Sequence, residues 1–394
     1  MKKHRRVALL IESSNAYGRG LLRGVVAYVR EHRPWSFYFA EQGRGDAPPK
    51  WLSTWDGDGI IARIENSKIA RAVAKSKLPA VDLSAARLVP TIPWVETHDA
   101  AIAKLVAQHF LERGFRHFAF CGDARFNWSK WRCTNFVAAI EAAGQRCDVF
   151  NPQGTTTVRV QAQIAAWLKT LPRPVGIMAA YDPRAQQVLG ECRVLNLAVP
   201  DEVAVVGVDN DELLCDLCSP PLSSVMPNHH KAGYEAAMLL DRMMSGARVA
   251  PAAHLIEPVR VVTRQSSDVL AVHDPEVAKA MNLIREHACE GINVSDVLKV
   301  VLISRRMLES RFKRLLGTTP HDEILRVKLN RVKQLLLDTD LSVSDVAQRT
   351  GFEHAEYLSV AFKHAEGMPP SHYRKQTRRG KTDLSQSSLM VRAL

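Results

Sequence analysis

Leu341-Ser-Val-Ser-Asp-Val-Ala-Gln-Arg-Thr-Gly-Phe352 carries the most informative signal in this 394-residue chain, because part of it occurs twice. Its segment Val343-Ser-Asp-Val346 also occurs as Val294-Ser-Asp-Val297. The two copies continue in the same order, with Leu308, Phe312-Lys313, Gly317 and Pro320 recurring as Leu358, Phe362-Lys363, Gly367 and Pro370. Matches that keep one order and nearly one spacing indicate a duplicated structural unit.

Each copy has the residues that begin and end a pair of short helices. Ser342 and Asp345 have the spacing of a helix N-cap and its N3 partner, and Asn293 with Asp296 repeats that spacing in the first copy. The apolar pairs expected to face inward on the second helix are Leu308 with Phe312 and Leu358 with Phe362. A glycine at the C-cap and a proline three residues later end each copy. Helix, short turn and helix make the helix-turn-helix form, whose second helix can enter the major groove of DNA.

Polar and basic side chains are expected on the outward face of each second helix. Arginine can bind guanine edges or phosphates there. The predicted DNA contacts are Ser304, Arg305, Arg306, Ser310, Lys313 and Arg314 in the first unit, and His354, Glu356, Tyr357, Ser359 and Lys363 in the second. A helix predicted over Ile324–Leu337 would hold the two units apart, so that they reach major-groove segments ~34 Å apart.

Charge supports a polyanionic partner. The chain has a net charge of +12, and residues 275–381 contain 19 Lys and Arg against 13 Asp and Glu. A charge of this sign favours nucleic acid or an anionic membrane surface as partner. No window has the ~18 apolar residues of a membrane span, and Val7–Ile11 is too short for the core of a signal peptide. We therefore expect double-stranded DNA as the partner and no membrane association.

Residues 277–375 resemble the DNA-binding domain of AraC-type regulators. The resemblance is most specific from Ser342 to Tyr373, where the stretch quoted above is followed by F-K-x-x-x-G-x-x-P-x-x-Y-R from Phe362. Leu302 stands where the first unit of this family has its turn glycine, so the resemblance implies an altered turn. Val360 stands where an Arg is common in the second recognition helix, so one phosphate or base contact of the family is in doubt.

The N-terminal two thirds of the chain alternate between short apolar runs and helical patterns. Strands are expected at 7–12, 35–41, 59–64, 79–83, 116–122, 175–181, 203–209 and 222–225, and helices at 19–32, 99–113, 131–143 and 184–195. Regular alternation predicts a doubly wound α/β fold, because parallel strands need helical crossovers. About 260 residues with so many strands fit two sheets better than one. We predict a sensor domain over 1–267, a linker over 268–276, the helical domain over 277–375 and a disordered tail over 376–394.

This N-terminal part resembles the LacI-type and periplasmic sugar-binding fold, most clearly at Val203–Asn210 and at Leu222-Ser-Ser-Val225. The resemblance implies two α/β lobes with a ligand in the cleft between them. The helix-turn-helix that precedes this fold in LacI-type regulators is not expected, because the first strand begins at Val7. The match at Ser13–Arg19, Trp131-Arg132 and Tyr181-Asp182 implies a small sugar, D-xylose, as effector. It also implies a homodimer that activates transcription with RNA polymerase in the cytoplasm.

Open parallel sheets bind ligands at the carboxyl ends of their strands. The polar and aromatic residues at those positions are Asn15, Tyr17, Glu41, Arg63, Trp128, Trp131, Arg132, Asp182 and Asp209. A sugar needs donors and acceptors for its hydroxyls and a flat apolar surface for its C–H groups. The alternative for each polar residue is a structural role, since a carboxylate at a strand end can also cap the next helix.

Other chemistry has weaker support. Cys215 and Cys218 with His229-His230 could suggest zinc, but the second paired ligand pattern is missing, so no metal is expected. Gly18-x-Gly20 lacks the rest of a nucleotide-binding loop, so no cofactor is expected. Seven cysteines scattered along the chain favour a reducing compartment, and Cys121 reads as a core residue. An enzyme, a transport receptor without DNA binding, and a regulator with another effector such as a purine remain alternatives.

Overall fold

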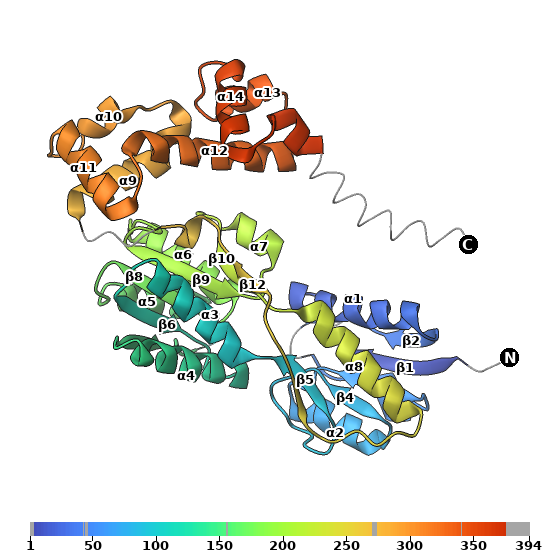
Figure 1. Cartoon of the computed structure of the whole chain (residues 1–394). Coiled ribbons are helices and arrows are strands. Elements are labelled where there is room, and N and C mark those ends of the chain that lie inside the picture. The colour runs from blue at the N-terminus through green and yellow to red at the C-terminus, as the bar shows by residue number, and fades with distance from the viewer. Residues whose placement is uncertain are drawn as a thin grey trace. The chain divides into compact units, whose positions relative to one another are not determined.

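The described residues form two compact units (Figure 1), and the division between them falls between residues 271 and 272. The structure, a computed structural model, describes residues 4–41, 43, 46–154, 157–269, 274–339 and 341–375. The tail 376–394, for which the sequence predicts disorder, lies outside the described residues.

The first unit contains two six-stranded sheets. The sheet that begins at the N-terminus has the order β11-β5-β4-β3-β1-β2, and its strand pairs are parallel. Its strands are β1 (Arg5–Leu10), β2 (Trp35–Phe39), β3 (Gly59–Ala62), β4 (Ala80–Asp82), β5 (Trp94–Thr97) and β11 (Ala253–Ile256). Strands β3 and β4 are buried along their whole length, as expected for parallel strands covered by helices on both faces.

The second sheet has the order β12-β10-β9-β8-β6-β7. Its strands are β6 (His117–Cys121), β7 (Cys147–Phe150), β8 (Val175–Ala179), β9 (Val203–Val208), β10 (Ser223–Met226) and β12 (Arg260–Val262). The edge strand β12 runs antiparallel to β10, and the other pairs are parallel. The helices of this unit are α1 (Ala16–Glu31), α2 (Ser67–Ser76), α3 (Asp99–Glu112), α4 (Asn127–Ala142), α5 (Thr157–Leu168), α6 (Asp182–Val194), α7 (Glu212–Leu217) and α8 (His229–Met244).

Each sheet with its helices forms one lobe, and the chain passes between the lobes three times. It crosses after β5, again after β10, and a third time between β11 and β12. After the second crossing, α8 packs against α1 of the first lobe (Figure 1). The two helices approach so closely that a Cβ on Gly24 would lie 2.0 Å from the carbonyl oxygen of His230, and one on Gly233 would lie 1.9 Å from that of Leu21.

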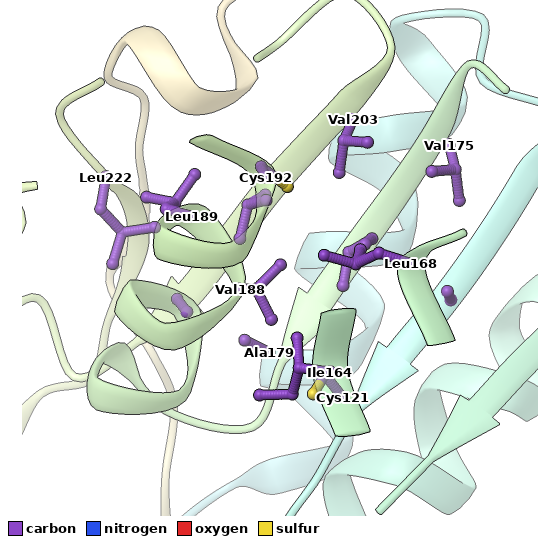
Figure 2. Close-up of a cluster of buried hydrophobic side chains, with 14 of the residues drawn as sticks. Cys121, Ile164, Leu168, Val175, Ala179, Val188, Leu189, Cys192, Val203 and Leu222 are labelled. Carbon is purple, nitrogen blue, oxygen red and sulfur yellow. The ribbon is translucent and has the colours of Figure 1, made fainter. Parts of the chain in front are cut away.

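The cores of the lobes lie between sheet and helices. Figure 2 shows one of them, in which Ile164, Leu168, Val188 and Leu189 from α5 and α6 pack against β8 and β9. Burial of each such side chain contributes about 1.5–3 kcal/mol. Cys121, predicted as a core residue, is fully buried in this cluster.

The second unit is helical in its described residues. Its helices are α9 (Pro275–His287), α10 (Val294–Leu298), α11 (Arg305–Leu316), α12 (Pro320–Asp338), α13 (Val343–Arg349) and α14 (Ala355–Glu366). The capping boxes predicted at Asn293 and Ser342 are present. Gly317 and Gly367 are the C-caps, with φ of 71° and 75°. The inward residues predicted for the second helix of each copy are fully buried: Leu308, Phe312, Leu358 and Phe362.

The turns of the two copies differ, as the departure at Leu302 implies. In the second copy Gly351 has a φ of 70°. Leu302 is not among the described non-glycine residues with positive φ, and its backbone N–H donates to Glu276 Oε2 on α9 at 2.6 Å. A carboxylate on a neighbouring helix thus stabilises the turn that lacks glycine.

The predicted fold class is confirmed: two parallel α/β sheets form two lobes, and helices follow. The sequence interpretation did not include α2, β5, β7, α5, α7, α8, β11 or β12, which together complete both sheets and cover them. No helix in the described part of the chain is long and apolar enough to cross a membrane.

Candidate functional site

A polar cleft lies where the carboxyl ends of strands from both lobes meet. The cavity opens to solvent. The first lobe contributes Tyr17 from α1, Arg63 after β3, Leu83 and Ala85 after β4, and Glu96 and Thr97 from β5; the second contributes Trp128 and Arg132 from α4 and Asp209 after β9. Both lobes are therefore needed to complete this cavity.

Arg63 is the buried cation of the first wall. Its side chain is 6% exposed, and its guanidinium donates to the carboxylates of Glu12 and Glu65. Burial opposes the charge, but these two carboxylates raise the pKa of Arg63 above its usual value, so it stays protonated. The Arg63 Cζ lies 4.8 Å from the centre of the Tyr17 ring, and its Nε is buried without a hydrogen-bond partner. That Nε is therefore an unused hydrogen-bond donor.

Glu96 supplies a matching acceptor on the same lobe. It is 4% exposed, and one carboxylate oxygen accepts from the guanidinium of Arg87. The other oxygen is buried and has no hydrogen-bond partner. The indole N–H of Trp94 favours the ionised carboxylate but does not reach hydrogen-bond geometry with it. Burial raises the pKa of Glu96, and Arg87 opposes that shift.

Arg132 and Trp128 form the wall of the second lobe. Arg132 is 4% exposed; its Nε donates to Asp99 Oδ1 at 2.7 Å and its NH1 to the carbonyl of Ala180 at 2.7 Å. Its Cζ lies 5.1 Å from the centre of the Trp128 ring. These contacts fix the guanidinium beside an aromatic face, an arrangement suited to a ligand with both hydroxyls and C–H groups.

Asp209 reaches the cavity from a constrained backbone. Its φ is 112°, which is unusual for a residue with a Cβ, and its N–H donates to the carbonyl of Val225 at 3.1 Å. Positive φ outside glycine is costly and concentrates at functional sites. Next to the cavity, His229 packs edge-on against Tyr17 with ring centres 4.6 Å apart. Burial lowers the pKa of His229 to about 4, so it is neutral near pH 7.

The structure brings five of the nine predicted ligand residues together in this cavity: Tyr17, Arg63, Trp128, Arg132 and Asp209. Asn15 and Asp182 line a neighbouring hollow that shares Tyr17 and Asp209 with the cavity. Glu41 is exposed and lines none of the described pockets. Trp131 packs under Arg87, whose Cζ lies 4.3 Å from the ring centre, and does not line the cavity.

Two residues of the neighbouring hollow have structural partners. Asn15 is the N-cap of α1 and accepts from the N–H of Gly18 at 2.8 Å. Asp182 is fully buried and accepts from Ser224 Oγ at 2.6 Å and from the N–H of Asp211 at 2.9 Å. Burial and the nearby Asp209 raise the pKa of Asp182 well above its usual value. The helix-capping alternative considered for such residues therefore applies to Asn15.

The sequence interpretation missed four cavity residues, which are Leu83, Ala85, Glu96 and Thr97. Glu96 and Thr97 belong to β5, a strand of only four residues. The signal available was the run Trp94-Val-Glu-Thr97 directly before a helix, where the carboxyl end of a strand should lie. In the described residues, no three His, Cys, Asp or Glu side chains gather in a way that could hold a metal ion.

The outward face of α11 in the second unit is exposed and basic. All six residues predicted there lie on the surface: Ser304, Arg305, Arg306, Ser310, Lys313 and Arg314. Ser304 is also the N-cap of α11, and Arg305 forms an ion pair with Glu309 at 2.9 Å. Because Leu308 and Phe312 fill the opposite side, this face is free to meet a partner.

The outward face of α14 is chemically different. His354, Glu356, Tyr357 and Lys363 are exposed, whereas Ser359 is half-buried and donates to the carbonyl of Ala355 at 2.8 Å. Val360 is 68% exposed on this face.

Two lysines of α12 hold the second copy in place. Lys328 Nζ donates to the carbonyl of Gly351 at 2.7 Å and lies 5.4 Å from the centre of the Phe352 ring. Lys333 forms an ion pair with Glu366 at 3.0 Å. These basic residues have contacts within the unit, so positive charge on this helix is partly structural.

Three family models match successive parts of the chain. A "XylR N-terminal domain" matches residues 6–100, a "Periplasmic binding protein-like domain" matches residues 107–267, and a "Helix-turn-helix domain" matches residues 298–376. The xylose operon regulatory protein of Escherichia coli (strain K12) is 34% identical over 94% of this chain and 97% of its own. That of Haemophilus influenzae is 30% identical over 95% of this chain and 99% of its own.

A solved structure described as the xylose-binding transcription activator xylR is similar over both units. It covers 95% of this chain and 98% of its own at 33% identity, with a TM-score of 0.80. Fold, cleft and paired helix-turn-helix units thus define a sugar-sensing, DNA-binding transcription regulator of the AraC type, and not an enzyme. The chain belongs to the family of xylose operon regulatory proteins. The predicted resemblance is confirmed.

Proposed function

We propose that the cleft binds an aldopentose, D-xylose, and that its occupation controls how the helix-turn-helix units engage a promoter. The observation that carries the proposal is the pair of buried groups without partners in the cavity, the Nε of Arg63 and a carboxylate oxygen of Glu96. A buried unpaired polar atom costs about 1–3 kcal/mol, so a ligand that supplies one acceptor and one donor is favoured. A sugar hydroxyl offers both.

The rest of the cavity suits a small sugar. Asp209 and Arg132 add a carboxyl group and a guanidinium on the second lobe, and the rings of Tyr17 and Trp128 supply flat surfaces. Similarity to xylose operon regulatory proteins along nearly the whole chain supports D-xylose as the choice among small sugars.

For the DNA-binding unit, we infer that the exposed faces of α11 and α14 enter successive major-groove segments. The residues that we propose for DNA contact are those predicted from the sequence. Arg306 and Lys313 are central on the α11 face, because they are exposed on the side opposite the buried Leu308 and Phe312. An exposed arginine such as Arg306 can read a guanine edge through two hydrogen bonds. The proposal includes a homodimer that activates transcription through RNA polymerase, in the cytoplasm where the DNA lies.

Coupling between the two sites has one thermodynamic requirement. The sugar must bind one state of the sensor more tightly than another, since a ligand of equal affinity for both shifts nothing. A cavity with walls on two lobes meets this requirement, because separating the lobes removes Trp128, Arg132 and Asp209 from the ligand.

Isothermal titration calorimetry of the full chain against D-xylose, L-arabinose, D-ribose and D-glucose tests the effector. D-xylose should bind most tightly. The same titrations on a Glu96→Ala variant should show a loss of affinity, whereas Arg33→Ala, an exposed first-lobe change, should match the wild type. Equal affinity for all four sugars, or heat with none of them, would exclude D-xylose as the effector.

A further inference from the structure

We propose that Arg87 is a positioning residue. It links Glu96, the carboxylate proposed to bind the sugar, to Trp131 on the opposite lobe, and this tie between the lobes favours the closed cleft. The inference rests on the proposed function in placing the ligand against Glu96. It gives a role to Trp131, which the sequence predicted as a ligand contact and which the structure places outside the cavity.

Arg87 bridges the lobes. It lies in the loop between β4 and β5 of the first lobe, whereas Trp131 belongs to α4 of the second. The Arg87 Cζ lies 4.3 Å from the centre of the Trp131 ring and 5.3 Å from that of Trp94 on its own lobe. A guanidinium within about 6 Å of an indole centre makes a favourable cation–π contact.

The backbone of Arg87 has an unusual conformation. Its φ is 50°, one of few positive values among the described non-glycine residues. Such a conformation costs about 1–3 kcal/mol and persists only where surrounding contacts compensate it. The Arg87 side chain contacts Glu96 and the two indole rings, and these contacts can offset that cost.

Glu96 connects the tie to the cavity. One of its oxygens accepts from Arg87, and the other is the unpartnered buried acceptor. A hydroxyl bound to the second oxygen restricts the carboxylate, and a restricted carboxylate holds the Arg87 guanidinium over Trp131. Bound ligand raises the equilibrium constant for forming the Arg87–Trp131 contact by some factor. By thermodynamic reciprocity, the contact raises the binding constant of the ligand by the same factor.

Arginine is required because lysine cannot reproduce both contacts. The planar guanidinium can stack on an indole ring while it donates to a carboxylate, whereas an ammonium offers a compact point charge. Arg87→Lys should therefore keep the ion pair with Glu96 and recover only part of the effect of the arginine.

A double-mutant cycle measures the tie. D-xylose affinity of the full chain is determined by calorimetry for the wild type, Arg87→Ala, Trp131→Ala and the double variant, with Arg33→Ala as control. A cation–π contact of about 0.5–2 kcal/mol corresponds to roughly a 2- to 30-fold change in affinity. Each single variant should lose affinity within this range, and Trp131→Ala should cost little more once Arg87 is gone. Fully additive losses would overturn the proposal.

A measurement without sugar separates this inference from the choice of effector. Spin labels carried by an unnatural amino acid at the exposed positions 33 and 146, one on each lobe, report the interlobe distance by pulsed electron resonance. Arg87→Ala and Trp131→Ala should both shift the distribution toward longer distances, with Arg87→Lys in between, while circular dichroism confirms the fold. Unchanged distances would overturn the tie. Shifted distances in a protein that ignores D-xylose would support the tie and reject D-xylose.

Discussion

Replacement of Gly351 by alanine should destabilise the contact between the two helix-turn-helix copies. The φ of Gly351 is 70°, and an added Cβ would lie 2.7 Å from the backbone nitrogen of Gly291 and 2.9 Å from the carbonyl oxygen of Ala288. Both atoms belong to the turn after α9, in the first copy's half of the unit, and neither can rotate away. Gly351 is thus both a turn residue and a point of contact between the second copy and the first.

The magnitude follows from two costs. A residue with a Cβ in the left-handed region costs about 1–2 kcal/mol, and overpacking against rigid neighbours costs about 1–3 kcal/mol. Gly351→Ala should therefore destabilise the second unit by about 2–5 kcal/mol. Gly317→Ala and Gly367→Ala are matched controls, because their φ values are 71° and 75° but nothing lies within 4 Å of an added Cβ. They should cost only about 1–2 kcal/mol.

Urea unfolding of the full chain can assign the loss to the right unit. All seven tryptophans lie between positions 35 and 167, so tryptophan fluorescence follows only the first unit. Far-ultraviolet circular dichroism also follows the helical second unit. Gly351→Ala should lower the midpoint seen by circular dichroism, leave the fluorescence transition in place and weaken DNA binding. A loss no larger than that of Gly317→Ala would refute the contact between the copies.

Four further predictions address the sites. Arg306→Ala should weaken promoter binding by about 1–3 kcal/mol if it reads a base edge; unchanged affinity in fluorescence anisotropy would remove it from the contacts. Asp209→Ala should abolish the rise in melting temperature caused by D-xylose while leaving sugar-free DNA affinity intact; a surviving rise would exclude Asp209 from the ligand site. Val360, 68% exposed on α14, should contact a thymine methyl. Replacing single thymines by deoxyuridine in a DNA site selected by the protein should weaken wild-type binding at one position and have no effect on Val360→Ala; equal losses for both proteins would exclude the contact. Burial raises the pKa of Asp82 to about 7, so the folded state binds its proton more tightly than the unfolded chain. The stability due to protonated Asp82 should be present below about pH 4 and be lost as the pH rises through about 7. The difference in unfolding free energy between wild type and Asp82→Asn should follow that course, and a difference independent of pH would contradict the assignment.

The sequence was most informative where local rules determine the structure. Capping boxes at Asn293 and Ser342, C-cap glycines and inward apolar pairs depend on neighbours within one helical turn, so the duplicated unit could be predicted in detail. The alternation of strands and helices predicted two parallel sheets, because each element could be recognised from its own local pattern. Strand β5 was missed because four residues are too few to show a periodicity, and α8 because its return to the first lobe is a long-range event.

The cleft was predictable only in part. Arg63, Arg132 and Asp209 follow strands or lie on a helix just after one, so the strand-end rule found them. Glu96 lies on a strand that the pattern did not show, and its proposed ligand role depends on which carboxylate oxygen Arg87 occupies. Trp131 is one residue before Arg132 on α4, so it points to another side of the helix and meets Arg87 instead of the cavity. Sequence spacing alone could not separate these neighbours.

The link between cleft and DNA is tested most directly by a reciprocal titration of the full chain. A fluorescent DNA duplex carrying the selected site is titrated with protein in the presence and absence of saturating D-xylose, and D-xylose is titrated with and without that DNA. We predict that the sugar changes the DNA dissociation constant and that DNA changes the sugar dissociation constant by the same factor. Tight binding of both ligands with neither constant altered by the other would contradict it.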